Sequence, residues 1–218
     1  MNLNSFSNID PTLRKYIEEN ILPSYAGFDK AHQIDHVNMV INQSLSLAET
    51  FPETDRNMVY AIAAFHDLGL INGRTYHHID SRKILEADPF IISFFSGDQI
   101  RTMGEAVEDH RASKSGKPRN IYGMIVAEAD RLIDAPTIIR RTVQYGLRHY
   151  PELDRDGHFH RTLQHLSDKY GRNGYLKIWL TESENARRLE ELRHLIDDPA
   201  AIRTLFDQIY STEHPTNQ

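Results

Sequence analysis

An apolar helical run that ends in an adjacent histidine and aspartate constrains this chain more than any other feature. Residues 61–65 read Ala-Ile-Ala-Ala-Phe and lead directly into His66 and Asp67. The run predicts the end of a buried helix, which Gly69 then stops in a left-handed conformation. Burial of an imidazole and a carboxylate is costly unless they are paired or bind a metal. Local capping and pairing would explain the two residues, and so would coordination of a divalent metal, since both side chains are metal ligands.

Helical periodicity continues along the chain, and no stretch shows the alternation of a β-strand. The expected helices span roughly residues 11–22, 31–50, 56–68, 76–87, 97–110, 121–133 and 135–150, followed by further helices up to about residue 210. Length and periodicity therefore predict one all-α domain over residues 1–218.

Composition and charge narrow the classes of partner. A net charge of -6 argues against a polymeric nucleic acid as partner, because phosphate backbones require clustered cations. The absence of cysteine excludes disulfides, thiolate zinc sites and a catalytic thiol. No signal-peptide core and no membrane-spanning apolar run is found, so the expected location is cytoplasmic, without a membrane partner.

Three further helices each direct inward one side chain that is able to bind a metal. His36 lies beside an apolar stripe, Asp130 falls inside an apolar run, and His110 continues the apolar line of positions 100, 103 and 107. His77 and His78 add a fifth candidate, but helical spacing does not choose between them. Four other histidines fall in a polar region and are expected at the surface: His149, His158, His160 and His165.

The order of these residues resembles the HD-domain superfamily of metal-dependent phosphohydrolases. The matching segments are His-Val at 36–37, Ala-Phe-His-Asp-Leu-Gly at 64–69 and Ala-Asp-Arg-Leu at 129–132. The resemblance covers about residues 31–139 and leaves about 140–211 as a C-terminal helical extension. It implies an HD-domain-like helical bundle in which a divalent metal is bound by His36, His66, Asp67 and Asp130.

Some branches of this superfamily hold a second metal with two added histidines, and the chain resembles those branches. The segment 76–85 is similar to the first added-histidine helix and favours His77 over His78, and the segment 108–111 supplies His110. The further block of the branch that cleaves cyclic dinucleotides is not found here, so that activity is not implied. The resemblance implies one or two ions of Mn, Fe, Co, Ni, Zn or Mg.

The function implied is hydrolysis of a phosphoester or phosphoanhydride bond in a nucleotide or other small phosphorylated compound, by metal-activated water. Asp67 is the best candidate to bridge two ions, since a carboxylate has two oxygens. Three cations are candidates to bind the phosphate: Arg74, Arg111 and Lys114, with Arg74 ranked first as a catalytic group because it follows the metal helix closely. A di-iron oxygenase and a non-catalytic nucleotide-sensing module are the alternatives. The C-terminal helices could cover the site, pack against it or form a homo-oligomer.

Overall fold

The computed structural model describes residues 8–29, 32–111, 116–131, 133–181 and 183–214. These described residues form eleven α-helices, three short 3-10 or π segments and no β-strand, which confirms the all-α fold class. None of their helices has both the length and the apolar character needed to cross a membrane. The chain groups into two compact units, residues 1–131 and 132–218. The single domain over residues 1–218, with its core at about residues 31–139, stays a prediction.

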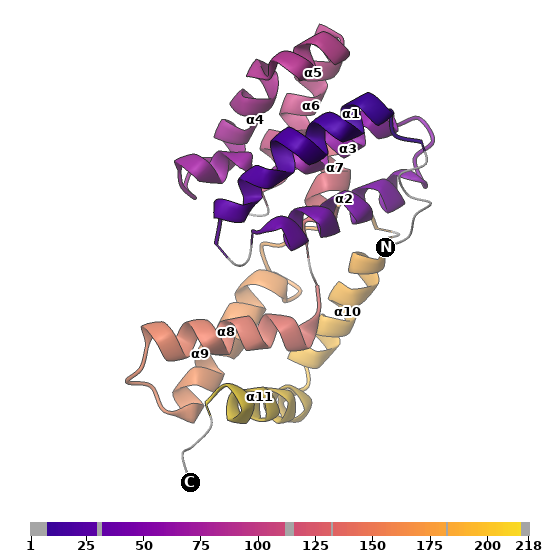
Figure 1. Cartoon of the computed structure of the whole chain (residues 1–218). Coiled ribbons are helices and arrows are strands. Elements are labelled where there is room, and N and C mark those ends of the chain that lie inside the picture. Colours follow the sequence, from indigo (N-terminus) through magenta and orange to yellow (C-terminus); the bar gives the residue numbers. More distant parts are fainter. Residues whose placement is uncertain (1–7, 30–31, 112–115, 132, 182, 215–218) are drawn as a thin grey trace. The chain divides into compact units, whose positions relative to one another are not determined.

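The first unit contains the elements that carry the predicted metal ligands (Figure 1). In chain order its elements are α1 (Pro11–Tyr16), η1 (Ile17–Ile21), η2 (Leu22–Gly27), α2 (Ile34–Ala48), α3 (Arg56–Phe65), η3 (Leu68–Asn72), α4 (His77–Ala87), α5 (Pro89–Phe94), α6 (Gly97–Asp109) and α7 (Ile121–Ala129).

Helix α3 is the central helix of this unit. Asp55 caps its N-terminus by accepting a hydrogen bond from the backbone N–H of Asn57, and residues 58–65 are all buried. The helix packs against α2, α4, α6 and α7. Alanine at positions 61, 63 and 64 allows this close approach on several sides, so the C-terminal end of α3 is surrounded by other helices.

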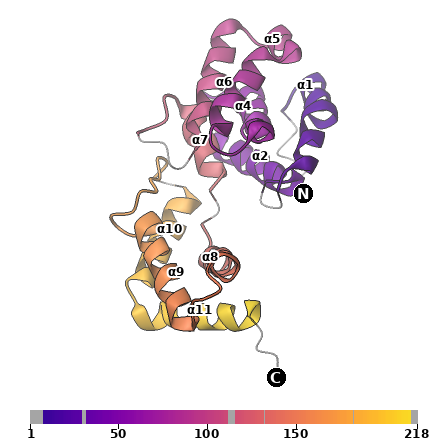
Figure 2. The same cartoon turned by 90° about the vertical axis from the view of Figure 1, so that its left-hand side faces the viewer.

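Helix α4 packs along α6 and against η3, and both Figure 1 and Figure 2 show α4, α5 and α6 as one group. The N-terminus of α6 is closed by a capping box between Ser96 and Gln99. Near the other end of α6, Glu108 accepts a hydrogen bond of 2.7 Å from Arg82 of α4. This ion pair fixes the register between the two helices that carry His77 and His110.

Two local predictions were wrong in their detail. Gly69 does not adopt a left-handed conformation, because the glycines with positive φ among the described residues are Gly73 and Gly116. Gly69 is required for space instead, since a Cβ there would lie 2.1 Å from the carbonyl oxygen of His77. Helix α7 ends at Ala129, so Asp130 caps the helix from outside its last turn.

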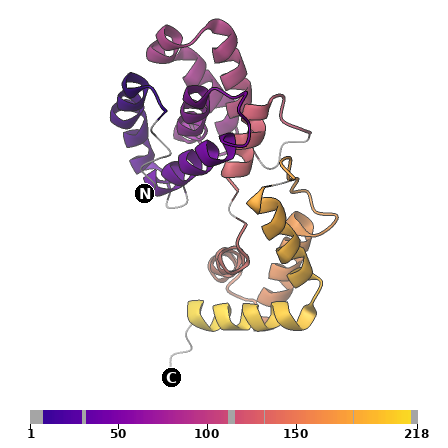
Figure 3. The same ribbon diagram turned by 90° about the vertical axis from the view of Figure 1, so that its right-hand side faces the viewer.

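The second unit consists of α8 (Ala135–His149), α9 (Arg155–Tyr170), α10 (Glu184–Ile196) and α11 (Pro199–Glu213). Helix α8 packs against α9 and α11, and α10 contacts α9 and α11. Figure 3 shows α11, in yellow, crossing α8, which is seen end-on. One prediction failed here, because His158 is buried in α9, with its ring centroid 5.7 Å from that of Tyr210. The other three histidines of this region are exposed, as expected.

Candidate metal centre

All six predicted metal ligands come together in the first unit. His36 projects from α2, His66 and Asp67 follow α3, His77 begins α4, and the last two, His110 and Asp130, follow α6 and α7. His66, Asp67 and His110 are buried, with exposed fractions of 0%, 4% and 2%. Residues from five helices, separated by up to 94 positions in the sequence, thus form one polar cluster in an apolar core.

The two carboxylate oxygens of Asp67 face two different groups of histidines. Oδ2 lies 3.6 Å from Nε2 of His36 and 3.3 Å from Nε2 of His66. Oδ1 lies 3.5 Å from Nε2 of His77 and 3.5 Å from Nε2 of His110. One carboxylate therefore serves two adjacent groups of nitrogen donors.

We call these groups half-site A and half-site B. Half-site A contains His36, His66, Asp67 Oδ2 and Asp130, whose Oδ1 lies 3.2 Å from Nε2 of His36 and 3.8 Å from Nε2 of His66. Half-site B contains Asp67 Oδ1, His77 and His110. The ligand atoms of His36, His66 and Asp67 lie within 4.8 Å of one another, and so do those of Asp67, His77 and His110. Each trio is compact enough to surround one ion.

Backbone carbonyls orient three of the four imidazoles. In each case Nδ1 lies within hydrogen-bond distance of the carbonyl oxygen three residues earlier: His66 with Ala63 at 2.8 Å, His77 with Arg74 at 2.8 Å and His110 with Val107 at 2.5 Å. Because a carbonyl only accepts, Nδ1 is the protonated nitrogen and donates this bond. Nε2 then faces Asp67 and is the ring nitrogen that remains for a metal, as in a metal-ligating histidine.

Three helices end at this cluster. His66 is the C-cap residue of α3, His110 that of α6 and Asp130 that of α7. The C-terminus of a helix carries a partial negative charge from its free carbonyl groups. Three such ends and two carboxylates make the potential of the cluster favourable for a cation.

The charges of the cluster are strongly coupled. Burial alone would raise the pKa of Asp67, but the surrounding histidines, with His66 foremost, hold it well below its ordinary value. The pKa of Asp130 is lowered in the same way against the effect of burial, chiefly by a hydrogen bond with His36. Burial would lower the pKa of His36, but its bonds to Asp130 and Asp67 raise it to about 9. Both carboxylates are therefore ionised at neutral pH and need positive charge beside them.

A tyrosine that the sequence analysis did not select forms hydrogen bonds with the backbone next to the cluster. The hydroxyl of Tyr25, which is fully buried in η2, donates to the carbonyl of Ala64 at 2.9 Å and accepts from the backbone N–H of Asp67 at 3.3 Å. It thus satisfies two backbone groups at the end of α3. Tyr25 lies in a 3-10 segment outside any amphipathic stripe, so periodicity gave no signal for it.

The geometry distinguishes the two adjacent histidines of α4. Nε2 of His77 faces Asp67, whereas Nδ1 of His78 is buried without a hydrogen-bond partner among the described residues. Burial, and then the charge of Arg111, lower the pKa of His78 to about 4. His78 is thus a neutral imidazole beside half-site B.

The three predicted phosphate-binding cations differ in their surroundings. The exposed Arg74 lies 3.5 Å from Asp29 Oδ2, an ion pair on the surface. Arg111 donates to the carbonyl of Thr75 at 2.8 Å, and its charge contributes to lowering the pKa of His77, so it lies close to half-site B. Lys114 falls outside the described residues.

Comparison with known proteins places this geometry in a family. Residues 34–134 match the family model of the HD domain, and all six ligands fall within the match. This stretch of the chain therefore belongs to the HD-domain superfamily. No curated protein and no solved structure gave a significant match. The donor set and the family agree on a site that can hold a divalent metal.

Proposed function

We propose that the chain is a metal-dependent phosphohydrolase that cleaves a phosphoester or phosphoanhydride bond of a nucleotide or other small phosphorylated compound. The observation that carries this proposal is the division of the two Asp67 oxygens between half-sites A and B. If both half-sites held an ion, they would form a site of the two-metal kind that hydrolyses phosphate esters.

The residues present fit one or two divalent ions. Half-site A offers two imidazoles and two carboxylates, and half-site B offers two imidazoles and the shared carboxylate. Nitrogen and oxygen donors without thiolate suit Mn, Fe, Co, Ni or Zn, and Mg where carboxylates dominate. When bound in such a site, divalent ions lower the pKa of water toward neutrality and offset the negative charge of phosphoryl oxygens.

The side chains of the protein have separate tasks in this proposal. Asp67 holds both half-sites at a fixed separation, and Tyr25 fixes the backbone of Asp67. In this proposal Arg111, beside half-site B, pairs with a phosphoryl oxygen, and Arg74 is a second candidate cation. The net charge of -6 favours a small phosphorylated substrate over a polymeric nucleic acid.

The test is phosphate release by protein of defined metal content. Chelated protein is reloaded in turn with Mn, Co, Mg and Zn and incubated with a panel of nucleotides and phosphoesters, and released phosphate and pyrophosphate are measured. Asp67→Asn keeps the shape of the side chain but removes its charge, and it should reduce release to background. Asp98→Asn is the matched control, because Asp98 is exposed at the opposite end of α6 and should leave release unchanged.

Three outcomes would overturn the proposal. If metal-loaded protein releases neither phosphate nor pyrophosphate from any compound of the panel, the proposed hydrolysis is rejected. Bound iron with oxygen-dependent turnover would favour the oxygenase alternative. Tight nucleotide binding without product would favour a sensing module.

A further inference from the structure

The second unit contains a pocket of about 420 Å³ between α8 and α9, which shares no residue with the candidate metal centre. Its volume lies in the range of small-molecule sites. The lining residues are Ile138, Arg141, Thr142, Tyr145, Arg161, His165, Lys169 and Tyr170. Three of these are permanent cations, one is a histidine, and none is a carboxylate.

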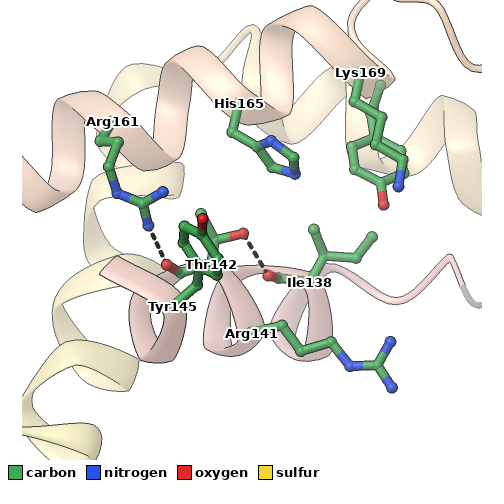
Figure 4. Close-up of a pocket in the computed structure, with 8 residues that line it drawn as sticks. Ile138, Arg141, Thr142, Tyr145, Arg161, His165 and Lys169 are labelled. Carbon is green, nitrogen blue, oxygen red and sulfur yellow. Dashed lines mark hydrogen bonds between the residues drawn. The ribbon is translucent and has the colours of Figure 1, made fainter. Parts of the chain in front are cut away.

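The basic residues of α9 that line the pocket are regularly spaced along the helix. Arg161, His165 and Lys169 follow one another at intervals of four residues, so they share one face of the helix. Figure 4 shows the three side chains directed from α9 toward α8, where Thr142 and Tyr145 face them. Arg141 adds a further cation from α8. The pocket thus has a basic wall from α9 opposite a wall of polar, aromatic and basic residues from α8.

Among the described residues the three cations of the pocket have no carboxylate partner, unlike most arginines of the same unit. Among the described residues, neither Arg141, Arg161 nor Lys169 forms an ion pair. By contrast, the following arginines of the unit all pair with carboxylates: Arg140, Arg155, Arg172, Arg187, Arg188, Arg193 and Arg203. The chain as a whole has a net charge of -6, so unpaired cations gathered in one pocket are unusual. They indicate that a bound anion supplies the negative charge there.

Arg161 is held in place and still has bonding capacity. Its guanidinium donates to the carbonyl oxygen of Thr142 and lies 5.7 Å from the ring centroid of Tyr145 and 5.5 Å from that of Tyr150. Its Nε atom is buried and has no hydrogen-bond partner among the described residues. A buried guanidinium donor without a partner is costly, and an anion beside Arg161 would stabilise its charge.

The pKa of His165 depends on the positive charges in the pocket. Its partial burial is the largest cause that lowers its pKa, followed by the positive charges of Lys169 and Arg161. Negative charges around His165 therefore do not fully offset the positive charges of Lys169 and Arg161.

We infer that this pocket binds a small anion that carries two or more phosphoryl groups, such as an inorganic or nucleoside polyphosphate. Arg161 and Lys169 attach to α9 eight residues apart, which is about 12 Å along the helix axis. Because of this separation, a chain of phosphoryl groups can pair with more of the cations than a single phosphate can. The inference does not depend on the proposed hydrolase activity.

Calorimetric titration of the full-length protein tests this site. The titrations use chelated protein, so that metal-bridged binding at the metal centre is absent, and the probes are orthophosphate, pyrophosphate, tripolyphosphate and ATP. Pyrophosphate or tripolyphosphate should bind with one site per chain and about tenfold more tightly than orthophosphate. Comparison of ATP with tripolyphosphate shows whether the nucleoside adds affinity.

Variants then locate the binding site. Arg141→Gln and Lys169→Gln change side chains that make no ion pair, and each should weaken tripolyphosphate binding by about tenfold. Arg140→Gln is the matched control, because Arg140 is the neighbour of Arg141 but pairs with Glu213, and it should leave affinity unchanged. Circular dichroism of each variant verifies that it is folded.

The inference is overturned if none of the four probes binds at millimolar concentration. It is also overturned if the control weakens binding as much as the two pocket variants, because the attraction is then a general charge effect. A single-stranded oligonucleotide is titrated in the same way, and if it binds while none of the small probes does, the inference is overturned in favour of a polymeric partner.

Discussion

Replacement of Gly69 by alanine should damage the first unit through a steric conflict between backbone segments. A Cβ at this position would lie 2.1 Å from the carbonyl oxygen of His77 and 2.5 Å from the backbone nitrogen of Ser81. Ordinary contact begins near 3.4 Å, so the start of α4 would have to move by roughly 1 Å. The neighbours are backbone atoms, which cannot rotate away as a flexible side chain would.

The magnitude follows from two contributions. Overpacking of a core contact costs about 1–3 kcal/mol. Movement of α4 also breaks the buried 2.8 Å bond from the N–H of Gly69 to the hydroxyl of Ser81, and an unsatisfied buried group costs about 1–3 kcal/mol. The free energy of unfolding of the first unit should therefore fall by about 2–6 kcal/mol.

Native-state hydrogen exchange of the amides in α3, α4 and α6 measures this loss within the first unit. Gly97→Ala is the matched control, because nothing lies within 4 Å of a Cβ at that position and its exchange should change by less than about 1 kcal/mol. Since α4 carries His77, Gly69→Ala should also weaken metal binding at half-site B. Equal exchange in the two variants would refute the argument from close approach.

Three further perturbations probe the same unit. His77→Ala should lose about one equivalent of metal by elemental analysis, whereas His78→Ala should retain the wild-type content; equal loss in both would contradict the assignment of half-site B. Tyr25→Phe leaves two backbone groups without their buried partner and should lower stability by about 1–3 kcal/mol, together with metal affinity; unchanged thermal denaturation and metal titration would exclude this role. Burial and then Asp88 raise the pKa of Tyr16 to about 12, so the contribution of Tyr16 to stability is full below its ordinary value of 10.0 and is lost as the pH rises through 12. Tyrosinate absorbance near pH 12 should be smaller in Tyr16→Phe by the amplitude of one tyrosine, since the pKa of Tyr170 is also raised to about 12. Equal alkaline unfolding of the two proteins would disprove the linkage.

Periodicity predicted the parts of this site that lie on regular helices. His110 was found because it continues an apolar line whose members Met103 and Val107 are buried. The end of α3 was found because a polar pair after a long apolar run has few explanations. Family resemblance then selected His77 over His78, which periodicity had left open, and the structure places His77 beside Asp67.

Other features depend on contacts that a linear pattern does not contain. The need for glycine at position 69 comes from the approach of α4, so the sequence suggested a turn conformation instead of a packing reason. Tyr25 acts from a short 3-10 segment without periodicity. His158 was expected at the surface because its neighbours in sequence are polar, but α8 and α11 both pack against α9, and His158 is buried.

The two half-sites share the single carboxylate of Asp67, so metal binding at one of them would be linked to metal binding at the other. An ion held in half-site A would orient this side chain and change the affinity of the oxygen that faces half-site B. Thermodynamic linkage then requires that each ion alters the affinity for the other by the same factor. A titration with two different metals, without any substrate, would therefore measure the coupling through Asp67. Coupling would appear as a deviation from the curves expected for two independent sites.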